Sequence, residues 1–241
     1  MSSKKFLNKT CAYCRTQGSS EGADHVVARE FFLAEDRNNL PKVPACCHCN
    51  GLKSRLEHYA LAVLPLGSQH LDASRYSTEY LAPRLARNRL LHRTLAKNLR
   101  GGRWERQRNG LILPAGSVPF ETSKITELMS YIVTGLFFYH WGEILDPLWY
   151  ADVAIIDPHH YEESVMPLLK YLQTPEDIIV RDLGRGTFRY RAIQSSIIKD
   201  FSLWEFQMFG GLEFAGDPRF PERSFTNIHA VTRPKKEALA A

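Results

Sequence analysis

Four cysteines near the start of the chain have the residue type and spacing of a zinc site. They form two Cys-x-x-Cys pairs, Cys11 with Cys14 and Cys46 with Cys49. A two-residue spacer lets one tight turn deliver two sulfurs, and tetrahedral Zn²⁺ takes four thiolate or imidazole ligands. Cys47 and His48 lie inside the second pair, but the spacing favours its outer cysteines, which leaves Cys47 as a spare thiol. Four thiolates leave no open coordination position, so the predicted zinc ion is structural.

Residues suited to phosphodiester hydrolysis lie between and just after these pairs. Hydrolysis of a phosphodiester needs a water molecule made basic and a cation that holds the charge developing on the phosphate oxygens. A histidine such as His25 has a pKa near neutrality and can take the proton. Asp24 and Asn50 carry carboxylate and amide oxygens, which are ligands for Mg²⁺ or Mn²⁺. These residue types predict a general base and a divalent-ion site within one short segment.

The same stretch resembles a known family, the HNH (ββα-metal) endonucleases of the bacterial zinc-knuckle subtype. The matching pattern is a pair of Cys-x-x-Cys motifs, an Asp-His at the end of a first strand, an Asn in the loop and Cys-x-x-Cys-Asn-x-x-Lys-Ser at a helix start. The run Val43-Pro44-Ala45-Cys46 also resembles the bacterial members. The resemblance covers roughly the first quarter of the chain.

The resemblance implies a role for each residue of the motif. His25 would be the general base, and Asp24 and Asn50 would bind the catalytic Mg²⁺ or Mn²⁺. Asn39 would hold the turn of the strand-loop-strand unit, and Lys53 stands at the family's lysine position. The third motif position is often histidine in this family; the asparagine found here is a variant that active members also carry.

A purely structural zinc module explains the four cysteines equally well. Asp-His is a common dipeptide, and lone asparagines in loops are usually turn residues. The joint order of these residues, including Asn50 and Lys53 directly after the second cysteine pair, favours the nuclease.

An arginine-rich segment follows the predicted nuclease module. Leucines at helical spacing predict an amphipathic helix from about Ser77 to Leu99, with the charges on its outer face. Arginine binds phosphate bidentately, so this stripe favours contact with a nucleic-acid backbone; the alternative is a solvated helix face. The candidate nucleic-acid-binding residues are Lys53, Arg55, Arg84, Arg87 and Arg93.

The remainder of the chain predicts a helix and an antiparallel sheet. The helix is expected over Lys124–Trp141 with Ser123 as its N-cap, and alternating residues predict strands at 150–157, 178–180, 188–193 and 204–209. A second helix is expected at 161–172, and Asp157-Pro158-His159-His160 is interpreted as its capped start rather than a metal site. The tail from Arg233 is expected to be disordered.

The predicted fold is therefore α+β in three parts. Residues 1–70 form the zinc-stapled ββα-metal module, 71–110 the basic helical segment and 111–241 a helix-plus-antiparallel-sheet domain whose role is open, including homodimer formation. Five cysteines at metal-binding spacing are typical of a reducing compartment, and the first residues are too polar for a signal peptide. The apolar run from Ile125 to Leu145 contains Glu127, His140 and Glu143, so a membrane span is not expected.

Together these patterns predict a cytoplasmic endonuclease that cuts DNA, with structural zinc and a catalytic Mg²⁺ or Mn²⁺. The net charge of +5 permits a polyanionic partner without requiring one. Two alternatives stay open. One is a zinc-stapled nucleic-acid-binding or regulatory module without turnover, and the other is a nuclease that cuts RNA.

Overall fold

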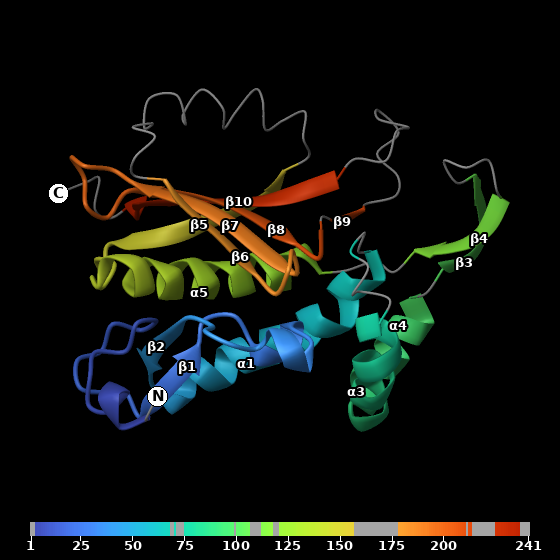
Figure 1. The fold of residues 1–241 in the computed structure, drawn as a ribbon, viewed down its shortest axis with the longest axis horizontal. Helices are drawn as coiled ribbons and strands as arrows, with labels where there is room; N and C mark the ends of the chain where they lie inside the picture. The colour runs from blue at the N-terminus through green and yellow to red at the C-terminus, as the bar shows by residue number, and fades with distance from the viewer. Residues whose placement is uncertain are drawn as a thin grey trace.

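The computed structural model describes residues 3–67, 70, 75–98, 100–106, 112–117, 121–156, 178–210, 212–213 and 225–236. Figure 1 shows three layers: an antiparallel sheet, one long helix against it, and the N-terminal segment packed beneath that helix. The predicted helix at 161–172 and the Asp157–His160 stretch lie outside the described residues.

Two short strands and a helix make up the N-terminal layer. Strand β1 (Gly22–His25) pairs antiparallel with β2 (Lys42–Ala45), which places His25 opposite Lys42. Helix α1 (Cys47–Val63) follows β2 directly, with Cys46 as its N-cap. Two short 3₁₀ turns lie between the strands, η2 (Arg29–Phe31) and η3 (Ala34–Asp36). The first cysteine pair lies between the 3₁₀ turn η1 (Ser3–Phe6) and strand β1. The helix expected to start at the second cysteine pair is α1.

The arginine-rich segment differs from the single helix predicted over 77–99. A short 3₁₀ turn, η4 (Leu64–Gly67), ends the N-terminal layer. The arginine-rich segment contains a π-helical turn, η5 (Ser77–Leu81), that leads into helix α3 (Ala82–Arg87). A second helix, α4 (Arg89–Asn98), follows. Asn88 interrupts the helix because its backbone leaves the helical region (φ −113°, ψ 77°). Leu90, placed by the sequence in the apolar stripe, is 78% exposed. The break turns the two helices relative to each other, so one stripe does not continue through both.

A hairpin crosses the predicted boundary at residue 110. Strands β3 (Arg100–Arg106) and β4 (Ile112–Ser117) pair antiparallel with an irregularity between Arg100 and Arg103. Gly101 and Gly102 fall at this irregularity. Glycine costs a helix roughly 1 kcal/mol per residue relative to alanine, which is one reason why the helical pattern stops before this point.

The C-terminal part has the predicted arrangement of a helix on an antiparallel sheet. Helix α5 (Thr122–Trp141) packs against the sheet, whose strand order is β5–β10–β8–β7–β6 with β9 paired to β10. The strands are β5 (Trp149–Ile156), β6 (Ile179–Leu183), β7 (Phe188–Gln194), β8 (Ser202–Met208), β9 (Leu212–Glu213) and β10 (Phe225–Pro234). The predicted N-cap is wrong: Ser123 lies inside the helix, and Glu121 is the N-cap without a side-chain capping bond.

Strand β10 is the main element that the sequence did not predict. It lies in the middle of the sheet, between β5 and β8. The prediction of a disordered tail from Arg233 is wrong at its start, because Arg233 belongs to β10 and its guanidinium pairs with Asp152 at 2.6 Å. The two strands on either side supply its hydrogen-bond partners, which a single segment of sequence does not reveal.

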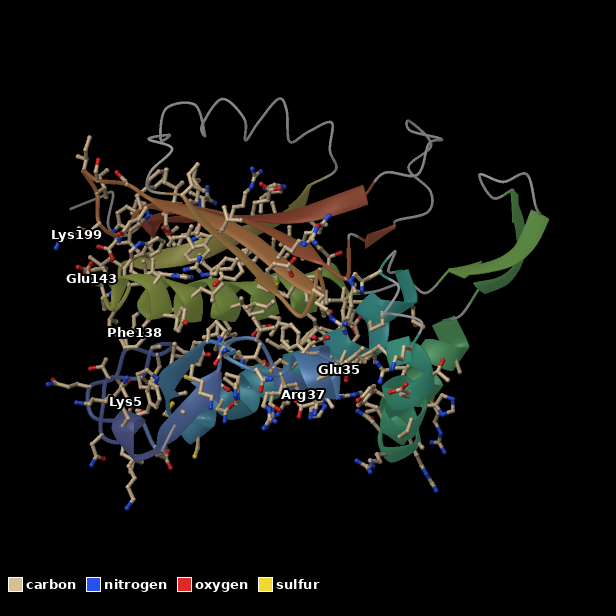
Figure 2. The ribbon with its side chains drawn as sticks, viewed as in Figure 1. Lys5, Glu35, Arg37, Phe138, Glu143 and Lys199 are labelled. Atoms are coloured by element: carbon tan, nitrogen blue, oxygen red, sulfur yellow. The ribbon has the colours of Figure 1, made fainter. Side chains whose placement is uncertain are left out.

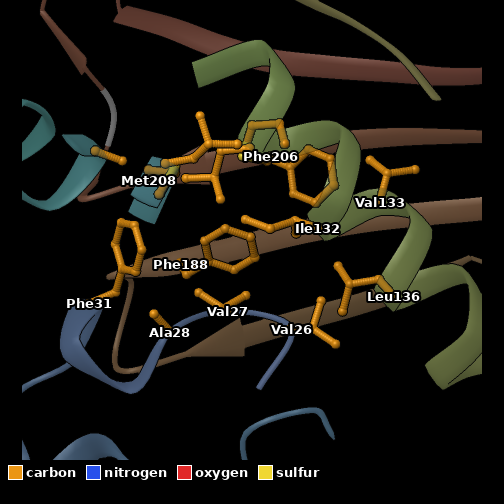
Figure 3. Packing of buried hydrophobic residues seen from close by; sticks show 14 of the residues in the cluster. Val26, Val27, Ala28, Phe31, Ile132, Val133, Leu136, Phe188, Phe206 and Met208 are labelled. Atoms are coloured by element: carbon orange, nitrogen blue, oxygen red, sulfur yellow. The ribbon is translucent and has the colours of Figure 1, made fainter. Parts of the chain in front are cut away.

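One buried cluster joins the N-terminal layer to α5 and the sheet. Figure 3 shows Val26 and Val27, which directly follow β1, packed between Leu136 of α5 and Phe188 of the sheet. Helix α5 lies close to Val26 at Gly135, where an added Cβ would lie 2.9 Å from a methyl carbon of Val26. The residues that follow His25 are therefore fixed by the core of the whole molecule.

Replacing Gly135 with alanine should lower the stability of the protein, although alanine favours a helix. The added methyl group would overlap Val26, and overpacking of a core costs about 1–3 kcal/mol. Gly51 of α1 is the matched control because a Cβ there meets nothing within 4 Å. In thermal unfolding, Gly51→Ala should raise the Tm through helix propensity, whereas Gly135→Ala should lower it by a few degrees. Equal increases for both variants would contradict the packing described.

Among the described residues, no helix has the length and apolar character needed to cross a membrane.

Candidate metal centre and adjoining polar site

The four predicted zinc ligands come together. The sulfur atoms of Cys11, Cys14, Cys46 and Cys49 all lie within 4.8 Å of one another, and this is a candidate metal site consistent with structural zinc. The Sγ atoms of Cys14 and Cys46 are 3.9 Å apart. The backbone N–H of Cys46 donates to the sulfur of Cys11 at 3.4 Å, and the N–H of Cys49 donates to that of Cys46 at 3.4 Å. The cluster joins the loop before β1 to the first turn of α1.

The thiols of this cluster differ in pKa because their surroundings differ. Burial raises the pKa of Cys11, and burial together with the neighbouring thiols raises that of Cys49. Burial also acts on Cys14, but hydrogen bonds with Thr16 and with the thiols of Cys11 and Cys49 outweigh it and lower the pKa to about 6. Zn²⁺ binds thiolates, so such a cluster releases protons when it takes the ion.

Cys47 stands apart from the four-thiol cluster, as predicted. It is exposed, and its thiol donates to the carboxylate of Glu21 at 3.1 Å. The backbone N–H of Cys47 donates to the other oxygen of the same carboxylate at 3.2 Å. The hydrogen bond from the thiol to Glu21, together with the negative charge of that carboxylate, raises the pKa of the Cys47 thiol.

A buried lysine connects α1 to the end of β1. Lys53 has no exposed side-chain surface, and its ammonium forms an ion pair with Asp24 Oδ2 at 2.9 Å. It donates to Glu57 Oε1 at 2.5 Å and to the carbonyl of His25 at 2.8 Å. The prediction that Lys53 binds nucleic acid is therefore wrong, because a group with three protein acceptors and no exposure does not reach a phosphate.

Two further groups complete this buried network. The hydroxyl of Tyr13 donates to Asp24 Oδ2 at 2.6 Å, and burial raises the pKa of that hydroxyl well above its usual value. Burial raises the pKa of Glu57 to about 7, although Lys53 acts in the opposite direction. The network thus places one ammonium between two carboxyl groups. Tyr13 was not singled out from the sequence, because a tyrosine between two zinc cysteines has no distinctive pattern.

His25 has the protonation state that a general base requires. The residue is half-buried, and this burial is the main reason why the pKa of its imidazole is lowered. The positive charge of Lys42 lowers the pKa further. The imidazole is therefore largely neutral at pH 7. Successive strand residues point to opposite faces, so the His25 side chain leaves β1 on the face opposite to buried Asp24.

Both predicted asparagines occupy exposed positions. Asn39 lies in the turn before β2 with a positive φ of 56°, a conformation that asparagine tolerates better than most residues. This agrees with the expected turn role. Asn50 lies in the first turn of α1, three residues before Lys53 and therefore on the same side of the helix. Because Lys53 contacts both Asp24 and His25, Asn50 faces the region where β1 ends.

The predicted basic residues are spread over α1, α3 and α4. Arg55 and Arg93 are exposed on α1 and α4, and Arg87 is exposed at the end of α3. Arg84 Nη1 lies 2.9 Å from Nδ1 of His58, a contact between α3 and α1 that the sequence did not predict.

Comparison of the chain with protein-family models finds no match, and comparisons with curated proteins and with solved structures find no significant match. The functional interpretation therefore depends on the residues and contacts of this chain itself.

Proposed function

We propose that the chain is a metal-dependent endonuclease of the HNH type that hydrolyses phosphodiester bonds in DNA. The observation that carries the proposal is the hydrogen bond from Lys53 to the carbonyl of His25 at 2.8 Å. It ties α1 to the end of β1 one helical turn from Asn50, and the four-thiol cluster holds the start of the same helix. These two contacts join the strand end that carries Asp24 and His25 to the helix start that carries Asn50.

The roles of the side chains follow from their chemistry. His25 takes the proton of the attacking water, since its lowered pKa keeps a ring nitrogen free to accept it. Asp24 and Asn50 would hold Mg²⁺ or Mn²⁺, which supplies charge stabilisation for the phosphate oxygens in the transition state. The donor set fits such an ion: among the described residues Asp24 uses only Oδ2 for Tyr13 and Lys53, which leaves Oδ1 for a ligand. Asn39 holds the turn that leads into β2.

The zinc ion and the catalytic ion have separate tasks. A four-thiolate site is closed, so zinc there fixes the position of α1 without touching the substrate. The hard oxygen donors near His25 suit a second ion that keeps water and phosphate ligands.

The test is the conversion of supercoiled plasmid by purified, zinc-loaded protein in Mg²⁺ or Mn²⁺. We expect relaxed or linear product with either ion and none from the zinc-loaded protein without added Mg²⁺ or Mn²⁺. A labelled RNA hairpin added as competitor separates the two substrates: slower plasmid cutting together with cut RNA would assign the activity to RNA as well. A zinc-loaded protein that cuts neither substrate would contradict the proposed turnover.

One observation favours a second function, a zinc-stapled nucleic-acid-binding module without turnover. Asp24 is 8% exposed, accepts a hydrogen bond from Tyr13 and forms an ion pair with Lys53. A purely structural carboxylate shows the same pattern. Retained DNA binding without metal-dependent cutting would be the result expected from that module.

A further inference from the structure

A cavity of about 700 Å³ lies beside the C-terminal half of α1. Its walls come from η2, α1, η5 and the two helices α3 and α4 on either side of the Asn88 break. Figure 1 shows α3 and α4 beside the C-terminal end of α1. The four-thiol cluster lies at the opposite, N-terminal end of that helix. Because the helix is interrupted at Asn88, arginines from both of its parts line the same cavity.

Positive charge dominates this cavity. Arg84, Arg87 and Arg89 line it, and Arg87 and Arg89 are exposed and form no ion pair within the part of the chain that the structure describes. The Nε of Arg84 is buried without a hydrogen-bond partner. The cavity therefore holds guanidinium groups with unused donors, which suit an oxyanion such as phosphate.

The acidic residues of the cavity do not cancel this charge. Glu79 is already paired with Arg75, whose Nε lies 2.7 Å from its carboxylate, so of the two lining carboxylates only Glu30 remains against three arginines. His58 adds no charge, because burial and then Arg84 lower its pKa. The balance favours an anionic ligand.

The aromatic wall of the cavity does not favour a nucleobase. Tyr80 stacks on Tyr76 with ring centroids 5.4 Å apart, and the guanidinium carbon of Arg37 lies 5.8 Å from the Tyr80 ring centroid. These two neighbours occupy ring faces on which a base would stack. The chemistry of the cavity therefore selects phosphate rather than a stacked base.

We propose that this cavity binds a backbone phosphate of the nucleic-acid strand, with Arg87 and Arg89 as the direct contacts and Arg84 supporting them. The proposal rests on the proposed function for the identity of the strand. His58 follows Asn50 by eight residues, about 12 Å along the axis of α1 at 1.5 Å per residue. The cavity would then hold the strand within a few nucleotides of the bond to be cut.

The test is binding of a fluorescein-labelled DNA duplex to the zinc-loaded protein without added Mg²⁺ or Mn²⁺, followed by fluorescence anisotropy at several salt concentrations. The double variant Arg87→Gln/Arg89→Gln should bind on the order of tenfold more weakly, the equivalent of one charged hydrogen bond. The slope of log K against log salt should fall by about 1 to 2. Arg87→Lys/Arg89→Lys should keep the slope and lose part of the affinity, because lysine keeps the charge but not the bidentate geometry.

The matched control removes two positive charges at the other end of the molecule. Lys199 lies at that end in Figure 2, and Lys235 donates its backbone N–H to Leu148 after the end of α5. Lys199→Gln/Lys235→Gln should leave affinity and salt slope close to those of the wild type. All variants should retain the wild-type zinc content and Tm, since the residues changed are exposed.

The outcomes separate this proposal from the proposed function. If the arginine variant binds DNA as the wild type does, or if the wild type does not bind the duplex at all, the cavity proposal is overturned. If the arginine variant loses binding while the wild type never cuts DNA, the cavity proposal stands and the nuclease proposal fails.

Discussion

Replacing Cys49 with alanine should abolish zinc binding and unfold the N-terminal layer. Cys49 supplies one of four sulfurs that gather within 4.8 Å, and it lies in the first turn of α1. Structural zinc contributes on the order of 10 kcal/mol of binding free energy in small modules, and at this candidate site the ion would join the loop before β1 to α1. The loss should appear as protein without zinc, with low solubility and a strongly reduced Tm.

Cys47→Ala is the matched control for that experiment. Cys47 lies two residues away but binds Glu21 instead of the cluster, and its side chain is exposed. This variant should keep one zinc per chain and a Tm within a few degrees of the wild type. A soluble, zinc-free Cys49→Ala protein with the wild-type Tm would show that the cluster does not stabilise the fold.

Replacing Lys53 with methionine should destabilise the protein by about 3–5 kcal/mol, the usual cost of removing one partner from a buried ion pair. Asp24 and Glu57 would then remain buried without their shared cation, and the carbonyl of His25 would lose its donor. The change in free energy of unfolding is measured by urea titration of the zinc-loaded protein. Lys199→Met is the control, since this lysine is 79% exposed and its removal should change stability by less than about 0.5 kcal/mol.

A second substitution shows whether the loss comes from uncompensated charge. Glu57→Gln removes one of the two acids that Lys53 balances, so the additional cost of Lys53→Met should be smaller in that background. Equal costs in both backgrounds would mean that the Glu57 contact contributes nothing. A stability of Lys53→Met equal to that of the wild type would contradict the buried network as a whole.

The elements with strong local patterns were predictable from the sequence. Helices α1 and α5 show apolar residues at helical spacing, and β7 and β8 alternate at the strand period. The four zinc ligands were predictable because their spacing is a local property of the chain. These features need no knowledge of distant partners.

The features that the sequence did not yield depend on contacts between distant segments. In the sequence Lys53 has the pattern of a surface lysine, and only the approach of Asp24 and Tyr13 makes a buried lysine stable there. Strand β10 contains the buried polar residues His229 and Thr232, which obscure its alternation. The break at Asn88 interrupts a leucine pattern that would suit one continuous helix, so the cavity among the arginines has no local signal.

The measurement that tests the account most directly is plasmid cutting by His25→Ala, beside the wild type and His92→Ala. His92 is an exposed histidine on α4 and controls for the loss of an imidazole as such. We expect the wild type and His92→Ala to cut in Mg²⁺ or Mn²⁺, and His25→Ala to be slower by about 10²–10⁴, with unchanged zinc content and DNA binding. Cutting by His25→Ala at the wild-type rate would contradict the assignment of His25 as the base.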